Sequence, residues 1–105
     1  MDLQLANKVV LITGGAKGIG AAIARAAGQE GAIPVIVDRD AAACESLQAE
    51  LRESGAKSHS LSLELSSPEN CKSAVEQTVA RLGRLDALVN NAGVNDGVGL
   101  ERGSP

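Results

Sequence analysis

A glycine-rich segment, Thr13-Gly-Gly-Ala-Lys-Gly-Ile-Gly20, stands between an apolar run that ends at Ile12 and an alanine-rich segment that begins at Ala21. Glycines at positions 14, 18 and 20 allow the backbone to leave a strand, turn tightly and enter a helix with no β-carbon in the way. The N–H groups of such a turn and the positive end of the helix dipole can face a phosphate. The segment is therefore interpreted as a phosphate-binding turn, although a glycine-rich turn can also do no more than turn.

The sequence around this turn favours the phosphate-binding interpretation. A second apolar run, Ile33 to Val37, ends in Asp38 at the spacing expected for a strand–helix–strand unit. A carboxylate at the end of the second strand can accept hydrogen bonds from both hydroxyls of an adenosine ribose. The combination predicts dinucleotide binding.

Asp38 also bears on which dinucleotide is bound. Its negative charge favours the free 2′-hydroxyl of NAD and repels the 2′-phosphate of NADP. Lys17 lies in the glycine turn and Arg39 follows Asp38, so either cation could reach a 2′-phosphate. Loop cations are more commonly solvated surface charges. We expect NAD to be favoured, with measurable use of NADP.

Length and composition exclude several classes of protein. The 105 residues allow one domain at most, and 13 acidic residues stand against 10 basic ones. With no basic stripe and no aromatic residue, nucleic-acid binding is not expected. The first residues lack the pattern of a signal peptide and no run approaches transmembrane length, so we expect a cytoplasmic protein with no membrane partner.

The two cysteines and the one histidine suggest neither a disulfide nor a metal site. Cys44 and Cys71 fall on the apolar faces of two predicted helices, where cysteine commonly acts as a small buried residue with a free thiol. His59 lies in a polar stretch and is expected at the surface. There is no Cys-x-x-Cys pair, so no metal is predicted.

Strands and helices are expected to alternate along the chain. The apolar first strand suits a position buried on both faces, and the alternating third strand suits a sheet edge. Asp40 and Ser67 are candidate N-caps, and Gly31 and Gly55 stand past helix ends. The expected strands cover 8–13, 33–38, 58–65 and 85–90, and the expected helices cover 18–30, 41–54 and 68–82. This order predicts an α/β fold, the N-terminal βαβαβαβ half of a Rossmann-type doubly wound parallel sheet.

The chain resembles the short-chain dehydrogenase/reductase family over essentially its whole length. The resemblance rests on two motifs and one residue: Thr13-Gly-x-x-x-Gly-x-Gly20, Asn90-Asn-Ala-Gly93 and Asp38. The resemblance implies a larger Rossmann domain with strand order 3-2-1-4-5-6-7 that binds NAD or NADP and forms dimers or tetramers. Glu64 stands where the family usually has an aspartate. The cofactor-binding positions that the resemblance implies are Gly14, Lys17, Gly18, Ile19, Gly20, Asp38, Arg39, Glu64, Leu65, Asn91, Ala92 and Gly93.

The family transfers a hydride with a Tyr-x-x-x-Lys pair and a serine that lie beyond the fourth strand. This sequence contains no tyrosine, so no residue of it is assigned a catalytic role. We expect residues 1–105 to be the N-terminal part of a single dinucleotide-binding domain, inactive alone, from an NAD(P)-dependent oxidoreductase. Two alternatives stay open: a nucleotide-binding module without catalysis, and a subunit that contributes only half of a sheet.

Only the segment Val94-Asn-Asp-Gly97 indicates a class of substrate. It follows the fourth strand near the predicted ligand crevice. Asn95 and Asp96 could bind the hydroxyls of a polyol or sugar, although such a triplet is more often simply a turn. The stretch is similar to bacterial sugar dehydrogenases of the family, in particular those that oxidise L-fucose. A small-molecule substrate is therefore expected.

Overall fold

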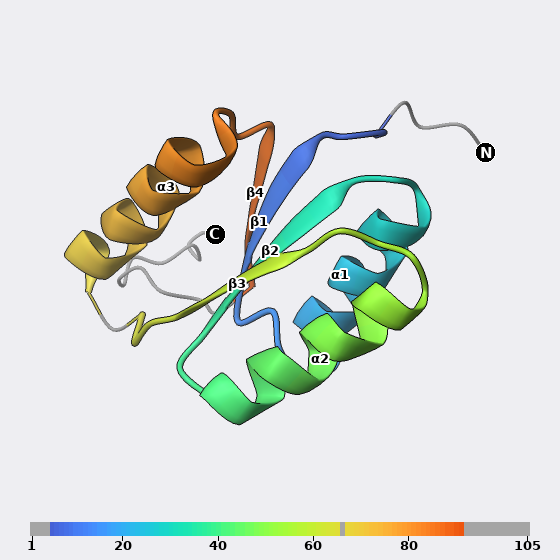
Figure 1. The fold of residues 1–105 in the computed structure, drawn as a ribbon. Coiled ribbons are helices and arrows are strands. Elements are labelled where there is room, and N and C mark those ends of the chain that lie inside the picture. The colour runs from blue at the N-terminus through green and yellow to red at the C-terminus, as the bar shows by residue number, and fades with distance from the viewer. Residues whose placement is uncertain (1–4, 66, 92–105) are drawn as a thin grey trace, which may run out of the picture.

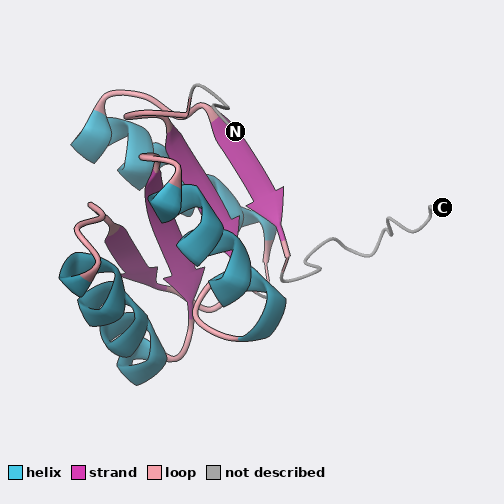
Figure 2. Ribbon diagram, turned by 90° about the vertical axis from the view of Figure 1, so that its right-hand side faces the viewer, coloured by secondary structure: helices cyan, strands magenta, loops and turns pink. Residues whose placement is uncertain are grey.

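A computed structural model describes residues 5–65 and 67–91 and confirms the predicted α/β fold (Figure 1). Four parallel strands form one sheet in the order β3-β2-β1-β4, and all of them run the same way (Figure 2). The change of direction in strand order therefore falls between β1 and β4. In chain order the elements are β1 (Val9–Thr13), α1 (Gly18–Gln29), β2 (Ile33–Asp38), α2 (Ala41–Glu53), β3 (His59–Ser62), α3 (Pro68–Leu82) and β4 (Ala87–Asn90).

Two layers of helix enclose the sheet: α1 and α2 lie on one face and α3 lies on the other (Figure 1). Alternate residues of β1 divide between two core clusters, with Ile12 toward α1 and α2 and Leu11 toward α3. All five residues of β1 are buried, as predicted for a strand covered on both faces. The predicted stripe of α2, Cys44, Leu47 and Leu51, is buried as well.

The helix boundaries follow the local signals in the sequence. The Asp40 side chain accepts a hydrogen bond from the Ala43 N–H at 3.0 Å, and the Ser67 hydroxyl accepts one from Asn70 at 3.3 Å. Gly31 closes α1 at a φ of 85°, which lets the Ala32 N–H bond to the Ala27 carbonyl. These predicted caps and stops are confirmed.

The third strand is shorter than predicted. β3 ends at Ser62 because Ser62 pairs with Asp38, the last residue of β2, and β2 is the neighbour to which β3 is hydrogen-bonded. Leu63 still donates its N–H to the Asp38 carbonyl, but beyond it the chain leaves the sheet. The predicted edge position of this strand is confirmed.

The start of β4 is fixed by a carboxylate rather than by the apolar pattern that predicted a start at residue 85. The Asp86 carboxylate accepts hydrogen bonds from the Val9 N–H and from Nε and Nη2 of Arg84, each at 2.8 Å. The Arg84 hydrogen bond and then the Val9 N–H lower the pKa of Asp86 to about 2. Further along β4, Leu88 pairs in register with Leu11 on the α3 side and is 54% exposed.

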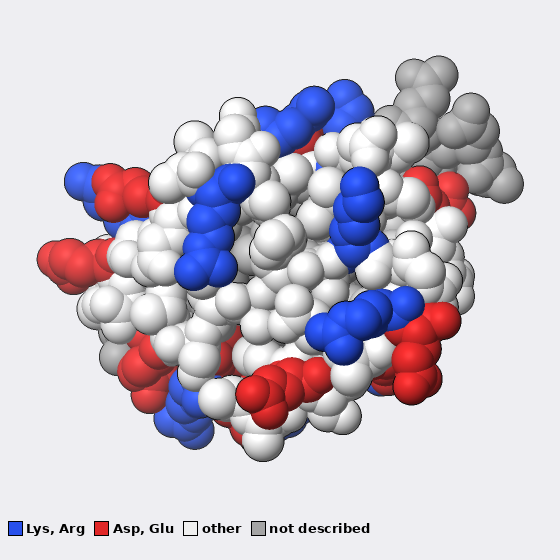
Figure 3. Space-filling model, in the orientation of Figure 1, with Lys and Arg blue, Asp and Glu red and all other residues white. Residues whose placement is uncertain are grey.

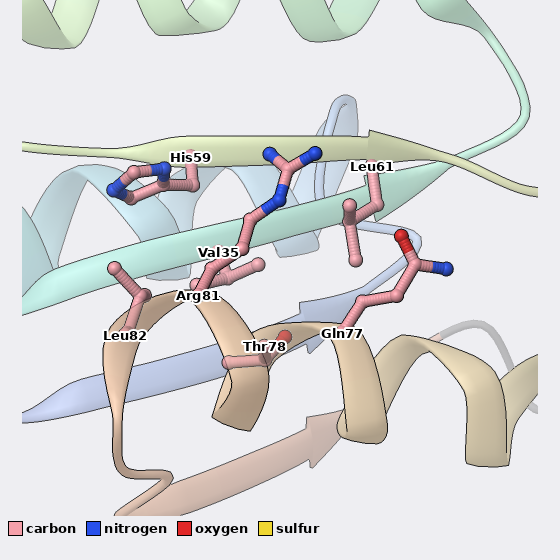
Figure 4. Close-up of a pocket in the computed structure, with 7 residues that line it drawn as sticks. All are labelled: Val35, His59, Leu61, Gln77, Thr78, Arg81 and Leu82. Carbon is pink, nitrogen blue, oxygen red and sulfur yellow. The ribbon is translucent and has the colours of Figure 1, made fainter.

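The cysteines are free, with Cys44 buried and Cys71 half-buried. His59 is also half-buried, which corrects the expected surface position. Pairing of β3 with β2 carries His59 next to the last turn of α3, beside Arg81 and Leu82 (Figure 4). The cavity there is about 10 Å³, which leaves room for about one water molecule.

Charges of both signs are interspersed on the face shown in Figure 3, and no basic patch gathers there. Among the described residues, no helix has the length and apolar character that a membrane span requires.

Candidate functional site: the glycine turn and the end of β2

The glycine turn brings the backbone of α1 unusually close to the end of β1. A β-carbon placed on Gly20 would stand 2.2 Å from the Gly14 carbonyl oxygen, so only glycine fits at this position. Gly14 and Gly18 adopt left-handed φ values of 64° and 54°, which side chains disfavour. The Gly14 N–H donates to the Val37 carbonyl at 2.7 Å and ties the turn to β2.

The start of α1 is open to an anion. Its N-cap residue, Lys17, makes no side-chain cap, and no acidic residue stands in the first turn. A β-carbon built on Gly18 would meet nothing within 4 Å, and Ile19 is 72% exposed. The N–H groups and the positive dipole end of α1 therefore face open space, which fits a pyrophosphate.

Asp38 lies next to this opening. One carboxylate oxygen accepts the Ala16 N–H of the turn at 3.3 Å, and the other accepts the Asp40 N–H at 3.1 Å. A carboxylate has about four acceptor positions, so both ribose hydroxyls can still donate to it. The glycine turn and the Asp38 carboxylate, which the sequence predicted to act together, therefore lie in direct contact.

Both cations considered for a 2′-phosphate form ion pairs. Lys17 Nζ lies 2.9 Å from Asp40 Oδ2, and Arg39 Nη1 lies 3.2 Å from Glu64 Oε2. The hydrogen bond and charge of Asp40 raise the pKa of Lys17. The Ala43 N–H and then Lys17 lower the pKa of Asp40. From the sequence, Asp40 is predicted only as a helix cap, because its pairing with Lys17 depends on how α1 and α2 are placed.

Three further predicted positions, Glu64, Leu65 and Asn91, lie among the described residues. Asn91 donates its side-chain amide to the Gly14 carbonyl at 3.2 Å, so the end of β4 braces the glycine turn. Glu64 is exposed and Leu65 is buried in the α3-side cluster. Ala92, Gly93, Asn95 and Asp96 lie outside the described residues.

A second, larger cavity of about 170 Å³ opens between α3 and the carboxyl-terminal parts of β1 and β4. It is lined by Leu11, Thr13, Cys71, Lys72, Val75, Leu88 and Asn90. The Thr13 hydroxyl donates to the Asn90 side-chain oxygen at 3.0 Å at one end of the cavity. In open α/β sheets ligands enter at this strand edge, where the strand order changes direction.

Fold and site together define a Rossmann-type protein whose first helix follows a glycine-rich turn and starts without a side-chain cap. The model of the short chain dehydrogenase family matches residues 8–104, and the chain belongs to that family, whose members are oxidoreductases that bind NAD(P). The resemblance found in the sequence is confirmed.

The similar proteins are named for different substrates. The chain is 41% identical over 93 residues to an L-fucose dehydrogenase of Bos taurus, covering 89% of this chain and 33% of that protein. It is 40% identical over 88 residues to a cyclopentanol dehydrogenase of Comamonas testosteroni, covering 84% and 35%. The similarity to L-fucose dehydrogenases is confirmed, here with a mammalian enzyme.

The crystal structure of an L-sorbose reductase from Gluconobacter frateurii, complexed with NADPH and L-sorbose, is similar with a TM-score of 0.83 and 35% identity. The similarity covers 91% of this chain and 37% of that one. The chain spans about a third of the length of the curated relatives that it matches.

Proposed function

We propose that this chain binds the adenosine and pyrophosphate end of NAD(P) and belongs to an oxidoreductase that transfers a hydride between the nicotinamide and a hydroxyl or carbonyl substrate. Residues 1–105 then form the N-terminal part of a single dinucleotide-binding domain. When bound, the cofactor supplies the hydride acceptor or donor. The residues of this chain hold it: the turn from Gly14 to Gly20 binds phosphate oxygens, and Asp38 binds ribose hydroxyls.

The observation that carries the proposal is the open start of α1 beside Asp38. The helix has no side-chain cap, its first turn holds no acidic residue, and Asp38 bonds directly to the turn through Ala16. A helix start that received no ligand would be expected to carry its own cap, as α2 and α3 do.

Titration of the full chain with NAD⁺, followed by calorimetry, tests the proposal. We expect saturable binding with a stoichiometry of about one, which AMP competes for because it carries the same phosphate and ribose groups. Absence of heat, together with unchanged amide NMR signals of residues 14–20 at saturating NAD⁺, would remove the proposed function.

Asp38 supports a preference for NAD over NADP. We expect Asp38→Ser to weaken NAD⁺ binding about tenfold or more, since hydrogen bonds to a charged group contribute about 1.5–3 kcal/mol. NADP⁺ binding should weaken less, because the repulsion of its 2′-phosphate is removed at the same time. An unchanged ratio of the two dissociation constants would contradict the assigned role of Asp38.

The substrate is proposed to be a small hydroxyl compound such as a sugar, with Asn95 and Asp96 as hydroxyl-binding residues. The similarity to an L-fucose dehydrogenase supports this class. In the complete enzyme Asp96→Ala should raise the KM for L-fucose, and unaltered KM and kcat would exclude this role. We further propose a cytoplasmic homo-oligomer, a dimer or tetramer, which analytical ultracentrifugation of the complete enzyme would test.

A further inference from the structure

Cations and carboxylates pair off around Asp38 at the carboxyl ends of the strands. Lys17 and Arg39, the two cations that the sequence suggested for a 2′-phosphate, pair with Asp40 and Glu64. Neither pair was foreseen from the sequence. Each pair changes what charge a bound nucleotide meets.

We propose that Asp40 is a positioning residue for cofactor choice: its carboxylate holds the Lys17 ammonium and thereby withholds that cation from a 2′-phosphate. This inference rests on the proposed binding of an adenosine ribose at Asp38. It adds a second residue to the selection of NAD over NADP, one that acts through Lys17 and not by contact with the ribose.

The geometry of Asp40 suits this role because its two oxygens have separate tasks. Oδ1 accepts the Ala43 N–H and caps α2, so the carboxylate is held in place by the backbone. Oδ2 then faces Lys17 at 2.9 Å. The Asp40 N–H in turn donates to Asp38 at 3.1 Å, so the carboxylate that holds the lysine is fixed to the residue that would bind the ribose.

The expected effect is modest. The side chains of Lys17 and Asp40 are 65% and 38% exposed. Pairs this exposed are screened by solvent and salt, and breaking one is expected to change an affinity by roughly two- to fivefold. The effect should fade as the salt concentration rises.

Substitution of Asp40 by another capping residue separates the two tasks. Asp40→Asn and Asp40→Ser both keep a side-chain acceptor at the N-cap and remove the charge that holds Lys17. NAD⁺ and NADP⁺ are titrated by calorimetry into the full chain and each variant, with circular dichroism as a check on folding. Glu45→Gln, which removes one exposed carboxylate elsewhere on α2, is the matched control.

We expect the dissociation constant for NADP⁺ to fall about two- to fivefold in both Asp40 variants. The constant for NAD⁺ should stay within error, and Glu45→Gln should change neither. A purely structural role of Asp40 would move both constants together. In a Lys17→Gln background Asp40→Asn should have no effect on NADP⁺, because the cation that it releases is absent.

Several results would overturn the inference. An equal gain in NADP⁺ affinity in the Lys17→Gln background would mean that Asp40 acts by direct repulsion. Unchanged NADP⁺ binding, or loss of the folded state in both Asp40 variants, would also overturn it while leaving the proposed function in place. A wild-type chain that binds neither nucleotide would overturn both.

Discussion

Two helices leave the same edge of the sheet, and they begin in different ways. α1 and α2 each follow a parallel strand within a few residues, yet α2 starts with a bound cap, Asp40, whereas α1 starts at Lys17 with none. α3, on the opposite face, is capped by Ser67 and has Pro68 in its first turn. The free N–H groups at a helix start need partners, and at α2 and α3 the chain supplies them.

The difference indicates which helix start is left open to a ligand. At α2 and α3 a side chain of the chain itself caps the helix start. α1 has no side-chain cap, and the turn that leads into it contains three of the predicted glycines. One of them, Gly20, must be glycine because a β-carbon there would lie 2.2 Å from the Gly14 carbonyl oxygen. The turn before the uncapped helix is hydrogen-bonded to Asp38 by the Ala16 N–H. We propose that the cofactor phosphates bind at this helix start.

The largest expected effect comes from placing a side chain in the glycine turn that leads into α1. Gly20→Ala forces its new β-carbon against the Gly14 carbonyl, so the turn must open; we expect a loss of about 1–3 kcal/mol in the free energy of unfolding. NAD⁺ affinity should fall about tenfold, the equivalent of one charge-assisted hydrogen bond. Chemical denaturation and calorimetry measure the two quantities.

The control for this variant is Ala26→Gly on an exposed position of the same helix. It should cost about 1 kcal/mol of helix stability and leave NAD⁺ affinity unchanged. If Ala26→Gly weakened binding as much as Gly20→Ala does, the α1 start would have no special role.

A smaller effect is expected at the capped start of α3. Ser67→Ala removes the acceptor for the Asn70 N–H and should lower the free energy of unfolding by about 1 kcal/mol. Nucleotide affinity should not change, because this helix start lies outside the proposed site. Ser67→Asn, which restores a cap, should recover the stability. A parallel loss of NAD⁺ binding in Ser67→Ala would contradict the contrast between the helices.

The smallest expected effect is a difference in how the stability contributed by the Asp40 and Ser67 caps depends on pH. The pKa of Asp40 is lowered in the folded protein by the Ala43 N–H and by Lys17, so its contribution to stability is present above the unfolded value of 3.8 and is lost as the pH falls below it. Ser67 does not titrate.

Denaturation of the wild type and of Asp40→Asn from pH 7 to pH 3 measures this difference. The two proteins should differ most at neutral pH and converge as the pH falls through 4, whereas Ser67→Ala should stay below the wild type by a constant amount. A difference between wild type and Asp40→Asn that grew on acidification would mean that the folded pKa of Asp40 is not lowered.

Short-range signals in the sequence predicted the helix boundaries correctly. Asp40, Ser67 and Gly31 mark helix boundaries through contacts with residues three to five positions away, and such contacts are legible in the order of residues alone. The apolar run of β1 likewise predicted a buried central strand. The end of β3 was not predictable, because it depends on where its neighbour β2 stops.

His59 shows the same limit. Its polar neighbours indicated a surface position, but strand pairing places it against α3 and half-buries it. Asp86 was predicted only as part of a strand, although it fixes the start of β4 by bonding to Val9, which is far away in the sequence.

The order of residues was sufficient for the glycine turn, the carboxylate after the second strand and the alternation of strands and helices, because each of these depends on local backbone geometry and on burial. Tertiary structure decided which charges meet. Lys17 pairs with Asp40 and Arg39 with Glu64 only because parallel strands bring their carboxyl ends to one edge of the sheet, and that edge joins segments that the sequence keeps apart.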